Sequence, residues 1–396
     1  MADRDIDVAV IGGGSAGLAT ALAAVKAGLS ARIYERYTHA RPAGTILNLW
    51  APPMHALECM GVNMEDVGAP CRSLFCKNTG ALRAEITNPD IGPGFVGLLR
   101  PDLYARMVDA LPDGVIEFNR NLTSIDDKGS HVQLTFADGA VVRAGVLIGA
   151  DGIDSFVRKH LWGDNPRRNH DLAIIGGYTY NIPDESKLGQ CVIMHDRQVQ
   201  AAYSTILSNG RIGQQWWVLE SWPDAKEAPA DLRAHALEKA QGFAGPFEEL
   251  ITSSPESNLQ RWSIRDHVPL KKWARGRISL AGDAAHATSP YAGYGAGMSI
   301  CDGYFIGQKL YGVDISDTKA VEAALAAYVT CQRDHTNKQV NQAYMLGKLF
   351  HYTPFPLNIL RDAVLDWTPL MQWQMGEANP KEIIAQLKVM GQGITA

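Results

Sequence analysis

Residue types that can do chemistry gather two thirds of the way along the chain, in the stretch GRISLAGDAAHATSPYAGYGAG. A short apolar run there is followed by a carboxylate, Asp283, by His286, by Pro290 and by four glycines. Glycine has no side chain to hold a ligand away from the backbone, and it adopts turns that other residues avoid. The stretch therefore predicts a site where a large ligand lies directly against the main chain.

A second glycine cluster lies near the N-terminus, in DVAVIGGGSAGLATALAAVKAGLSARIYER. An apolar strand over residues 8–11 leads into the glycines, and an alanine-rich helix and a second strand follow. This order predicts a dinucleotide site in which Gly12 makes a tight turn, Gly14 admits a pyrophosphate and Gly17 lets helix and strand pack closely. The free N–H groups of the helix would face the phosphates, and Glu35 would accept hydrogen bonds from a ribose.

A third motif, VLIGADGIDSFVRKHL, repeats the pattern of a strand ending in glycines, here with Asp151 and Gly152, and Ser155 or Asp154 can cap the helix that follows. The segments between the motifs do not alternate strand and helix, as a doubly wound nicotinamide dehydrogenase would. A helix near PPMHALECMG precedes short strands at GALRAEI, VIEFNR, HVQLTFADG and VVRAGVLIGADG. The last three strands predict a β-meander inserted before the main sheet resumes.

Composition excludes several classes of function. The chain has 396 residues, 46% of them hydrophobic, and a formal net charge of -5 without any basic run, so nucleic acid is not an expected partner. Acidic residues precede the first apolar run, and no stretch reaches the roughly 18 apolar residues of a membrane span. We expect a soluble cytoplasmic protein with six reduced cysteines.

Taken together, the motifs resemble the single-component FAD-dependent aromatic hydroxylases with the p-hydroxybenzoate hydroxylase fold. The resemblance rests on the N-terminal glycines with Glu35, on LLRPDLYARMV around Arg100, on the Asp151–Gly152 pair and on DHVPLKKWARGRISLAGDAAHATSP. It extends to the C-terminal stretch that begins YVTCQRDHTNK. Within the family, SPYAGYGAGM is most similar to the salicylate hydroxylase and 6-hydroxynicotinate 3-monooxygenase branch.

The resemblance implies an α/β fold of two parts. A Rossmann-like FAD-binding domain of the glutathione-reductase type would take residues 1–71, 98–170 and 262–396, including the C-terminal helices. A substrate-binding antiparallel β-sheet would take residues 72–97 and 171–261. In the second part LAIIGGYTYNI, CVIMHD, VQAAYSTILS and QQWWVLES show the alternation of strands, and their sheet would cover the flavin.

The resemblance also implies the reaction. NADH or NADPH would reduce FAD, O2 would be captured as a flavin C4a-hydroperoxide, and an oxygen atom would pass to an electron-rich aromatic ring. The substrate would be a ring carboxylate or a polyketide-like phenol, and the family suggests a homodimer. The chain has no second glycine fingerprint for a resident nicotinamide, which fits transient nicotinamide binding.

Cofactor contacts can be transferred from the family residue by residue. Asp283 would bind ribityl hydroxyls, Arg100 would contact the middle of FAD, and Pro290 would lie against the flavin face. The helix that opens at Gly295–Gly297 would point its N–H groups at the flavin pyrimidine edge, where charge accumulates on reduction. The full expected set is Gly12, Gly14, Ser15, Ala16, Gly17, Glu35, Arg36, Arg100, Asp151, Gly152, Gly282, Asp283, Pro290, Gly293, Gly295, Ala296, Gly297 and Met298.

Substrate contacts are expected from the loop GTILNLW, from the β-sheet and from the residues around Pro290. The expected substrate residues are Asn48, Trp50, Tyr203, Trp216, Tyr291 and Tyr294. The expected catalytic residues are Pro290, Tyr203 and Tyr291. Trp216 and Trp217 are adjacent on a strand, so one should face the cavity and the other should pack. His286 is interpreted as structural, His351 is left outside the site, and no metal is expected.

Alternatives remain open at this stage. Cys71 and Cys76 have the spacing of the redox pair in flavoprotein disulfide reductases, although APCRSLFCKNTGALRAEI reads as a strand and a turn instead of a helix. The fold could also serve an FAD-dependent reductase or a halogenase, although the halogenase motif GWxWxIP is absent from the sequence. A flavin-binding protein without turnover is the remaining alternative.

Overall fold

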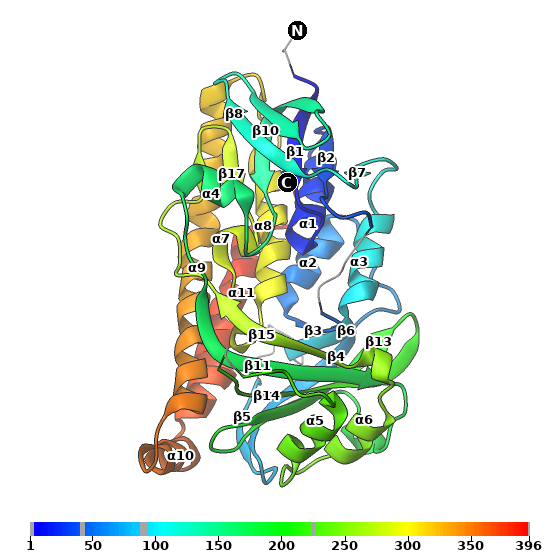
Figure 1. Ribbon diagram of the computed structural model, residues 1–396, viewed down its shortest axis with the longest axis vertical. Helices are drawn as coiled ribbons and strands as arrows, with labels where there is room; N and C mark the ends of the chain where they lie inside the picture. The colour runs from blue at the N-terminus through cyan, green and yellow to red at the C-terminus, as the bar shows by residue number, and fades with distance from the viewer. Residues whose placement is uncertain (1–3, 40–43, 88–93, 224–225, 395–396) are drawn as a thin grey trace.

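The computed structural model describes residues 4–39, 44–87, 94–223 and 226–394. Two β-sheets lie one above the other along the longest axis of the molecule, and long helices connect them (Figure 1). The helix α9 (Thr318–Tyr352) runs beside both sheets, and α10 (Leu357–Trp367) projects at the lower end (Figure 1). No helix among these described residues is both long and apolar enough to cross a membrane.

The upper sheet contains the parallel core that the glycine motifs predict. Its strands follow the order β16 (Ala274–Arg275), β17 (Ile278–Leu280), β10 (Val141–Gly149), β1 (Ile6–Ile11), β2 (Ala31–Tyr34) and β7 (Ile116–Glu117). From β17 to β7 every pair is parallel. Parallel strands are covered on both faces, which explains why they read as short continuous apolar runs. The Rossmann-like fold is confirmed.

The meander differs in one strand from the prediction. It consists of β8 (Leu122–Asp127), β9 (Val132–Phe136) and β10, paired antiparallel. The stretch VIEFNR instead supplies β7, which pairs parallel with β2. In β8 only two of six residues are buried, so its polar sequence LTSIDD gives no apolar alternation to recognise.

The lower sheet is the predicted antiparallel sheet. Its order is β15 (Gln260–Asp266), β11 (Arg168–Thr179), β14 (Arg211–Ser221), β13 (Gln200–Ser208), β12 (Gln190–His195), β4 (Ala69–Lys77), β6 (Gly94–Leu99) and β3 (Ile46–Leu49), with β5 (Leu82–Glu85) beside β4. Among the described strands of this sheet, only β12 and β4 pair in parallel. The strand β3 pairs in this sheet although it lies within the range predicted for the cofactor domain.

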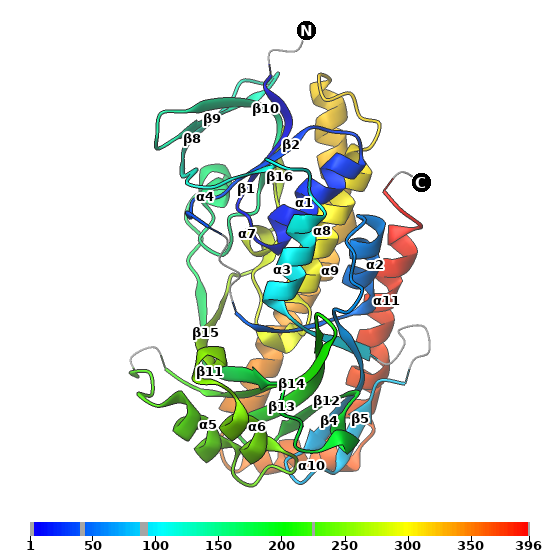
Figure 2. The same ribbon diagram turned by 90° about the vertical axis from the view of Figure 1, so that its right-hand side faces the viewer.

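Helices cover the sheets on defined sides. The outer face of the lower sheet packs against α5 (Leu232–Ala240) and α6 (Phe247–Ser253), while its inner face looks toward the upper sheet (Figure 2). Further helices are α2 (Ala51–Cys59), α3 (Arg100–Asp109), α4 (Phe156–Trp162), α7 (Asp283–His286), α11 (Asn379–Met390) and the π-helical turn η5 (Gln372–Ala378).

The two helices that begin at glycine turns pack directly on each other. In α8 (Gly295–Leu310), Gly303 and Gly307 lie against Ala19 and Ala23 of α1 (Ser15–Lys26). A Cβ atom added to Gly307 would be 2.4 Å from the Cβ atom of Ala23, so only glycine permits this approach. The close contact fixes the starts of both helices relative to each other, and both starts face the cavity between the sheets.

Candidate active site

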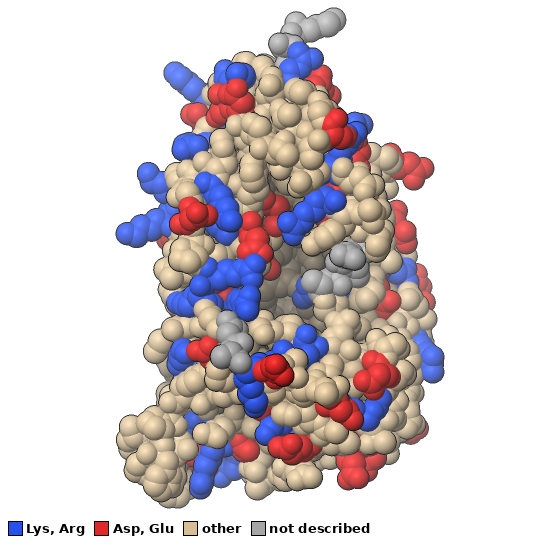
Figure 3. Space-filling view, viewed as in Figure 1, with Lys and Arg blue, Asp and Glu red and all other residues tan. Residues whose placement is uncertain are grey.

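One large cavity lies between the two sheets, with a volume of about 2330 Å³. Its opening appears as a hollow in the middle of the molecular surface, with charged side chains around the rim (Figure 3). We name the part toward the upper sheet the cofactor arm, lined by Gly12, Gly14, Ser15, Ala16, Glu35, Arg36, Arg100, Asp151, Gly152, Asp283, Gly293, Gly295 and Ala296. We name the part under the lower sheet the ring arm, lined by Phe75, Ile193, His195, Gln200, Trp217, Tyr291 and Phe350. Pro290 lies on the wall as well.

The turn between β1 and α1 confirms the geometry predicted for its glycines. Gly12 has a φ of 101°, and a Cβ atom there would be 2.5 Å from the carbonyl oxygen of Ala150. A Cβ atom on Gly17 would be 1.9 Å from the carbonyl oxygen of Gly12, so helix and strand touch. Gly14 has no atom within 4 Å of its Cβ position and caps α1 without a side-chain hydrogen bond. The first N–H groups of α1 are thus accessible to an anionic ligand.

The acidic residue after β2 reaches back to this turn. One carboxylate oxygen of Glu35 accepts a hydrogen bond from the Gly13 N–H (2.7 Å), and the other accepts from the Tyr37 N–H (3.0 Å). Glu35 therefore lies beside the glycines, where a ribose of a bound dinucleotide would be expected.

The turn after β17 is fixed by a buried ion pair that sequence analysis missed. Asp302 in α8 accepts hydrogen bonds from the Gly282 N–H (2.7 Å) and from His286 Nε2 (2.6 Å). Burial alone would lower the pKa of His286, but the adjacent negative charge of Asp302 outweighs burial and raises it. The structural interpretation of His286 is confirmed. An aspartate inside the apolar run MSICDGYFIG was the available signal.

The carboxylate of Asp151 is turned toward α4 instead of the cavity. It accepts hydrogen bonds from the Ser155 hydroxyl (2.5 Å) and from the Phe156 N–H (2.6 Å). Ser155 in turn accepts from the Arg158 N–H and is the N-cap, one of the two predicted candidates. Asp151 thus positions the backbone of its own turn, and Gly152, with a φ of 79°, lines the cavity beside it.

Several polar atoms on the cavity wall have no partner among the described residues. They are Arg100 Nε, Thr288 Oγ1, Trp50 Nε1, Asn337 Oδ1, and Nε and Nη2 of Arg261. Burial lowers the pKa of Arg100, while the negative charge of Asp283 opposes that effect. Buried polar groups normally find hydrogen-bond partners, so their orientation here fits a polar ligand that fills the cavity. Together with the open glycine turns, these groups fit FAD.

Four predicted cofactor residues are not on the cavity wall: Gly17, Gly282, Gly297 and Met298. Three of them are glycines that allow close backbone packing: a Cβ atom on Gly282 would be 2.6 Å from that of Ala16. Met298 is fully buried in the hydrophobic core. Their effect on a bound cofactor would be exerted through the backbone turns that they shape.

The ring arm contains a chain of hydrogen bonds across the lower sheet. Trp217 Nε1 donates to Gln200 Oε1 (2.9 Å), and Gln200 Nε2 donates to His195 Nε2 (2.8 Å). The His195 ring stacks on Phe350 with 4.0 Å between centroids and lies 3.4 Å from the Tyr291 hydroxyl. Because His195 Nε2 accepts from Gln200, it is an unprotonated nitrogen that faces Tyr291.

A second chain begins at Tyr291 and ends in α9. His351 Nδ1 donates to the carbonyl oxygen of Gln198 (2.6 Å), so His351 Nε2 is the accepting nitrogen. The Tyr291 hydroxyl is 2.6 Å from this nitrogen and donates to it. The oxygen of Tyr291 keeps free acceptor capacity toward the ring arm. His351 was left outside the predicted site because nothing in the sequence joins it to Tyr291.

These side chains are uncharged near neutral pH. Burial lowers the pKa of His195 well below its usual value, and it lowers the pKa of His351 to about 4. Burial also raises the pKa of the Tyr291 hydroxyl well above its usual value. The side chains of the ring arm therefore offer hydrogen bonds and carry no charge themselves, while Arg361, 5.6 Å from the Phe350 ring, adds to the lowering of both histidine pKa values.

Two predicted substrate residues lie on the wrong face of the sheet. Tyr203 and Trp216 are in the core between the lower sheet and α5–α6: Tyr203 packs edge-on against Phe247, and Trp216 donates to Ser254. Trp217 is the tryptophan that faces the cavity. The expectation that one tryptophan faces the cavity and the other packs is confirmed. The choice of Trp216, and of Tyr203 as substrate ligand and catalytic residue, was wrong because their strand positions alternate outward.

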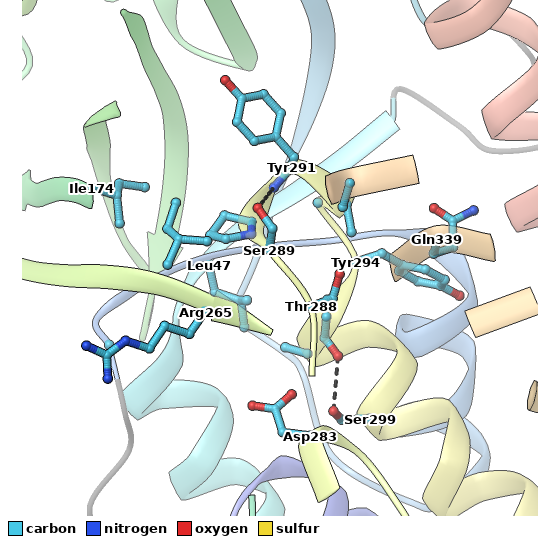
Figure 4. A pocket seen from close by; sticks show the side chains of 18 of the residues that line it. Leu47, Ile174, Arg265, Asp283, Thr288, Ser289, Tyr291, Tyr294, Ser299 and Gln339 are labelled. Carbon is cyan, nitrogen blue, oxygen red and sulfur yellow. Dashed lines mark hydrogen bonds between the residues drawn. The ribbon is translucent and has the colours of Figure 1, made fainter. Parts of the chain in front are cut away.

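Three other predicted substrate residues do line the cavity, with different roles. Asn48 Oδ1 accepts from Ser204 and Gln215, so its amide is held by the sheet. The Trp50 ring packs on Phe95. Tyr294 is buried on the cavity wall, and its hydroxyl donates to Gln386 (2.5 Å) in α11. Figure 4 shows Tyr291 and Tyr294 pointing in different directions from the segment that follows Ser289, with Asp283 on the cofactor side.

The cysteine pair is not a redox center. Cys71 and Cys76 are both free thiols in β4, and positions five apart on a strand point to opposite faces. Cys71 accordingly lies in the core facing the cavity, and Cys76 lies in the core under α5 and α6. Burial raises the pKa of both thiols, which makes them unreactive.

The fold and these turns define a flavoprotein of the FAD-dependent monooxygenase class. The family model described as FAD binding domain matches residues 5–343, and the chain belongs to that family. The 6-hydroxynicotinate 3-monooxygenase of Bordetella bronchiseptica is 32% identical over 318 residues, covering 74% of this chain and 80% of the relative.

Solved structures agree with the fold. Klebsiella pneumoniae HpxO complexed with FAD and uric acid superposes with a TM-score of 0.82 at 22% identity, covering 99% of this chain and 98% of that one. A salicylate hydroxylase substrate complex gives a TM-score of 0.73 at 23% identity and covers 96% and 97%. The predicted resemblance, including its branch, is confirmed.

Proposed function

We propose that this monooxygenase uses NADH or NADPH and O2 to hydroxylate an uncharged, electron-rich aromatic ring such as a phenol. The observation that carries the proposal is the ring arm itself. It is a mostly apolar space whose polar groups, His195, Gln200 and Tyr291, form a connected and uncharged network. Such a space favours a flat ring with one or two hydroxyl groups.

The cofactor arm would hold FAD with little movement. The N-terminal N–H groups of α1 would bind the pyrophosphate, and Glu35 would exchange its bond to Gly13 for a ribose hydroxyl. Asp283 would bind the ribityl chain, and the unpartnered Arg100 Nε would bind a cofactor oxygen. FAD, once reduced, activates O2 so that one oxygen atom can be transferred to a ring.

The role of the chain itself is to orient the ring and accept its proton. A substrate hydroxyl would donate to the oxygen of Tyr291, whose own proton is already directed at His351 Nε2. A phenol proton becomes far more acidic while the ring is losing electrons to an incoming oxygen. At that moment the substrate proton can pass to Tyr291 and the Tyr291 proton to His351, although the low pKa of His351 keeps it uncharged at rest.

The absence of a positive charge argues for a neutral ring. A carboxylate placed in a poorly hydrated space costs several kcal/mol unless a cation pairs with it. None of the seven side chains that define the ring arm is a lysine or arginine; Arg265 lines the same cavity outside that set, and Arg361, 5.6 Å from the Phe350 ring, is paired with Asp362. The relative from Bordetella bronchiseptica is named for a ring that bears a carboxylate, so the substrate proposed here differs in charge from that one.

The proposal is tested with FAD-loaded protein. NADH and NADPH oxidation and O2 uptake would be followed with phenols, hydroxybenzoates and hydroxynicotinates, and products would be identified by mass. We expect phenols to accelerate oxidation and to yield products heavier by one oxygen atom. Bound FAD without substrate-stimulated oxidation by any ring would instead favour the alternative of a flavin-binding protein without turnover.

A further inference from the structure

The cavity does not end at the ring arm. It continues between α9 and the π-helical turn η5 to the outer surface of the molecule. We name this extension the lateral arm, lined by Met345, Leu346, Leu349, Leu370, Met371 and Trp373. These six side chains are apolar, although the same two elements also contribute Gln342 and Gln374 to the cavity wall.

The outer end of the lateral arm is an exposed apolar mouth. The exposed fractions are 64% for Met345, 56% for Trp373, 45% for Leu370 and 41% for Leu349, although all four also line the cavity. Contiguous exposed apolar side chains are unusual on a soluble protein and mark binding sites. The neighbouring α10 lobe, at the lower left of Figure 3, shows no charged side chains on the face seen in that view.

The wall of the lateral arm is held in an unusual backbone conformation. The turn η5 is a π-helix over Gln372–Ala378, and such turns occur mostly as short insertions, frequently at functional sites. The Gln372 side chain ties the turn to β5, because it accepts from the Glu85 N–H (2.9 Å) and donates to the Glu85 carbonyl (3.0 Å). The two bonds place Met371 and Trp373 at the arm without blocking it.

The volume is consistent with a third occupant. Pockets for single ligands are about 300–1,000 Å³. Two such pockets, one for the cofactor and one for the ring, take at most about 2,000 Å³, and the cavity here has about 2330 Å³. The lateral arm is part of this volume, and Gln342 and Gln374 contribute polar groups to the wall beside its apolar side chains.

We propose that the lateral arm binds an apolar substituent of the substrate, so that the natural substrate is a phenol-like ring bearing an alkyl chain of several carbons. This inference rests on the proposed function, because the ring of that substrate occupies the ring arm. The chain would pass Leu346 and Met371 and reach Met345 and Trp373 at the mouth.

The test measures binding as a function of chain length. Dissociation constants of FAD-loaded protein would be measured by the change in flavin absorbance and by calorimetry, for phenols with a methyl, butyl or heptyl group at the 3- or 4-position. Burying one methylene strengthens binding by up to about fourfold. We expect heptyl compounds to bind at least about 50-fold more tightly than methyl compounds, with a more negative heat-capacity change.

A matched pair of variants locates the effect. Met345→Glu places a charge at the mouth, whereas Leu360→Glu places one at a residue of similar exposure (62%) that does not line the cavity. The heptyl-to-methyl affinity ratio should fall about tenfold or more in Met345→Glu and remain unchanged in Leu360→Glu.

Two results would overturn the inference: equal affinities for all chain lengths, or equal effects of the two variants. Failure of the proposed function is separate, because it appears as no stimulation of NAD(P)H oxidation by any phenol.

Discussion

The cofactor arm and the ring arm share one cavity but are built by different means. The cofactor arm consists of backbone: glycine turns and helix starts that follow β1 and β17. The ring arm consists of side chains from the lower sheet, from the turn at Tyr291 and from α9, which are far apart in the chain. A ligand held by backbone depends on turn geometry, whereas one held by side chains depends on individual atoms. Substitutions in the cofactor arm should therefore change FAD affinity and stability, whereas substitutions in the ring arm should change kcat or KM.

The largest expected effect comes from removing one hydroxyl group of the ring arm, which should change turnover without changing cofactor binding. Tyr291→Phe removes the oxygen that would accept the substrate proton, so kcat with a phenol should fall by about 10²–10⁴-fold while FAD affinity is unchanged. The loss should shrink as pH rises toward about 10, where phenols ionise without help. Steady-state kinetics across pH would measure this.

Tyr203→Phe is the matched control, since Tyr203 has the same side chain on the outer face of the sheet. Its kcat should be close to that of the wild type. A similar loss in both variants would contradict the assignment of Tyr291.

The next effect concerns the cofactor arm. Asp302→Asn leaves the buried His286 without its counter-charge and weakens the turn at Gly282. Removing one partner of a buried ion pair typically costs about 3–5 kcal/mol, so the free energy of unfolding should drop by that order. FAD affinity should fall as well. Denaturant unfolding and flavin titration would test this; unchanged stability would contradict a structural role for the pair.

A smaller effect distinguishes the two faces of the lower sheet. Trp217→Phe leaves Gln200 Oε1 without its donor inside the ring arm, which costs about 1–3 kcal/mol and should raise KM roughly tenfold. Trp216→Phe loses its bond to Ser254 in the outer core, so it should lower stability by about 1–2 kcal/mol and leave KM unchanged. If instead Trp216→Phe raised KM and Trp217→Phe lowered only the stability, the assignment of Trp217 to the cavity face of β14 would be wrong.

The smallest effect is a pH dependence of stability. The pKa of His286 is raised in the folded state above the value of about 6.5 in the unfolded chain. Its contribution to stability is therefore complete below about pH 6.5 and is lost as pH rises through the raised value. Melting temperatures between pH 6 and 9 should fall more steeply for the wild type than for His286→Gln. Parallel curves would show that His286 is not protonated in the fold.

The same contrast explains which parts of the molecule the sequence predicts. A glycine turn is largely local: the steric need at Gly17 and the hydrogen bond from Gly13 to Glu35 both arise within residues 10–35. The cofactor arm and the parallel sheet could be predicted for that reason.

The ring arm could not be predicted in the same way. The bond from Tyr291 to His351 spans 60 positions, and the one from His195 to Tyr291 spans 96. Alternation along β14 requires that Trp216 and Trp217 face opposite sides, but it does not say which side is the cavity. Only the placement of α5 and α6 on the outer face decides that choice.

The central claim is that the ring arm accepts a neutral ring beside a flavin held by the cofactor arm. The most direct test compares resorcinol with 2,4-dihydroxybenzoate, which differs from it by one carboxylate, in NAD(P)H-dependent formation of oxygenated product by FAD-loaded protein. The uncharged arm predicts a kcat/KM at least about tenfold higher for resorcinol. A preference for the carboxylate would contradict the account and would point to a cation elsewhere on the cavity wall, such as Arg265.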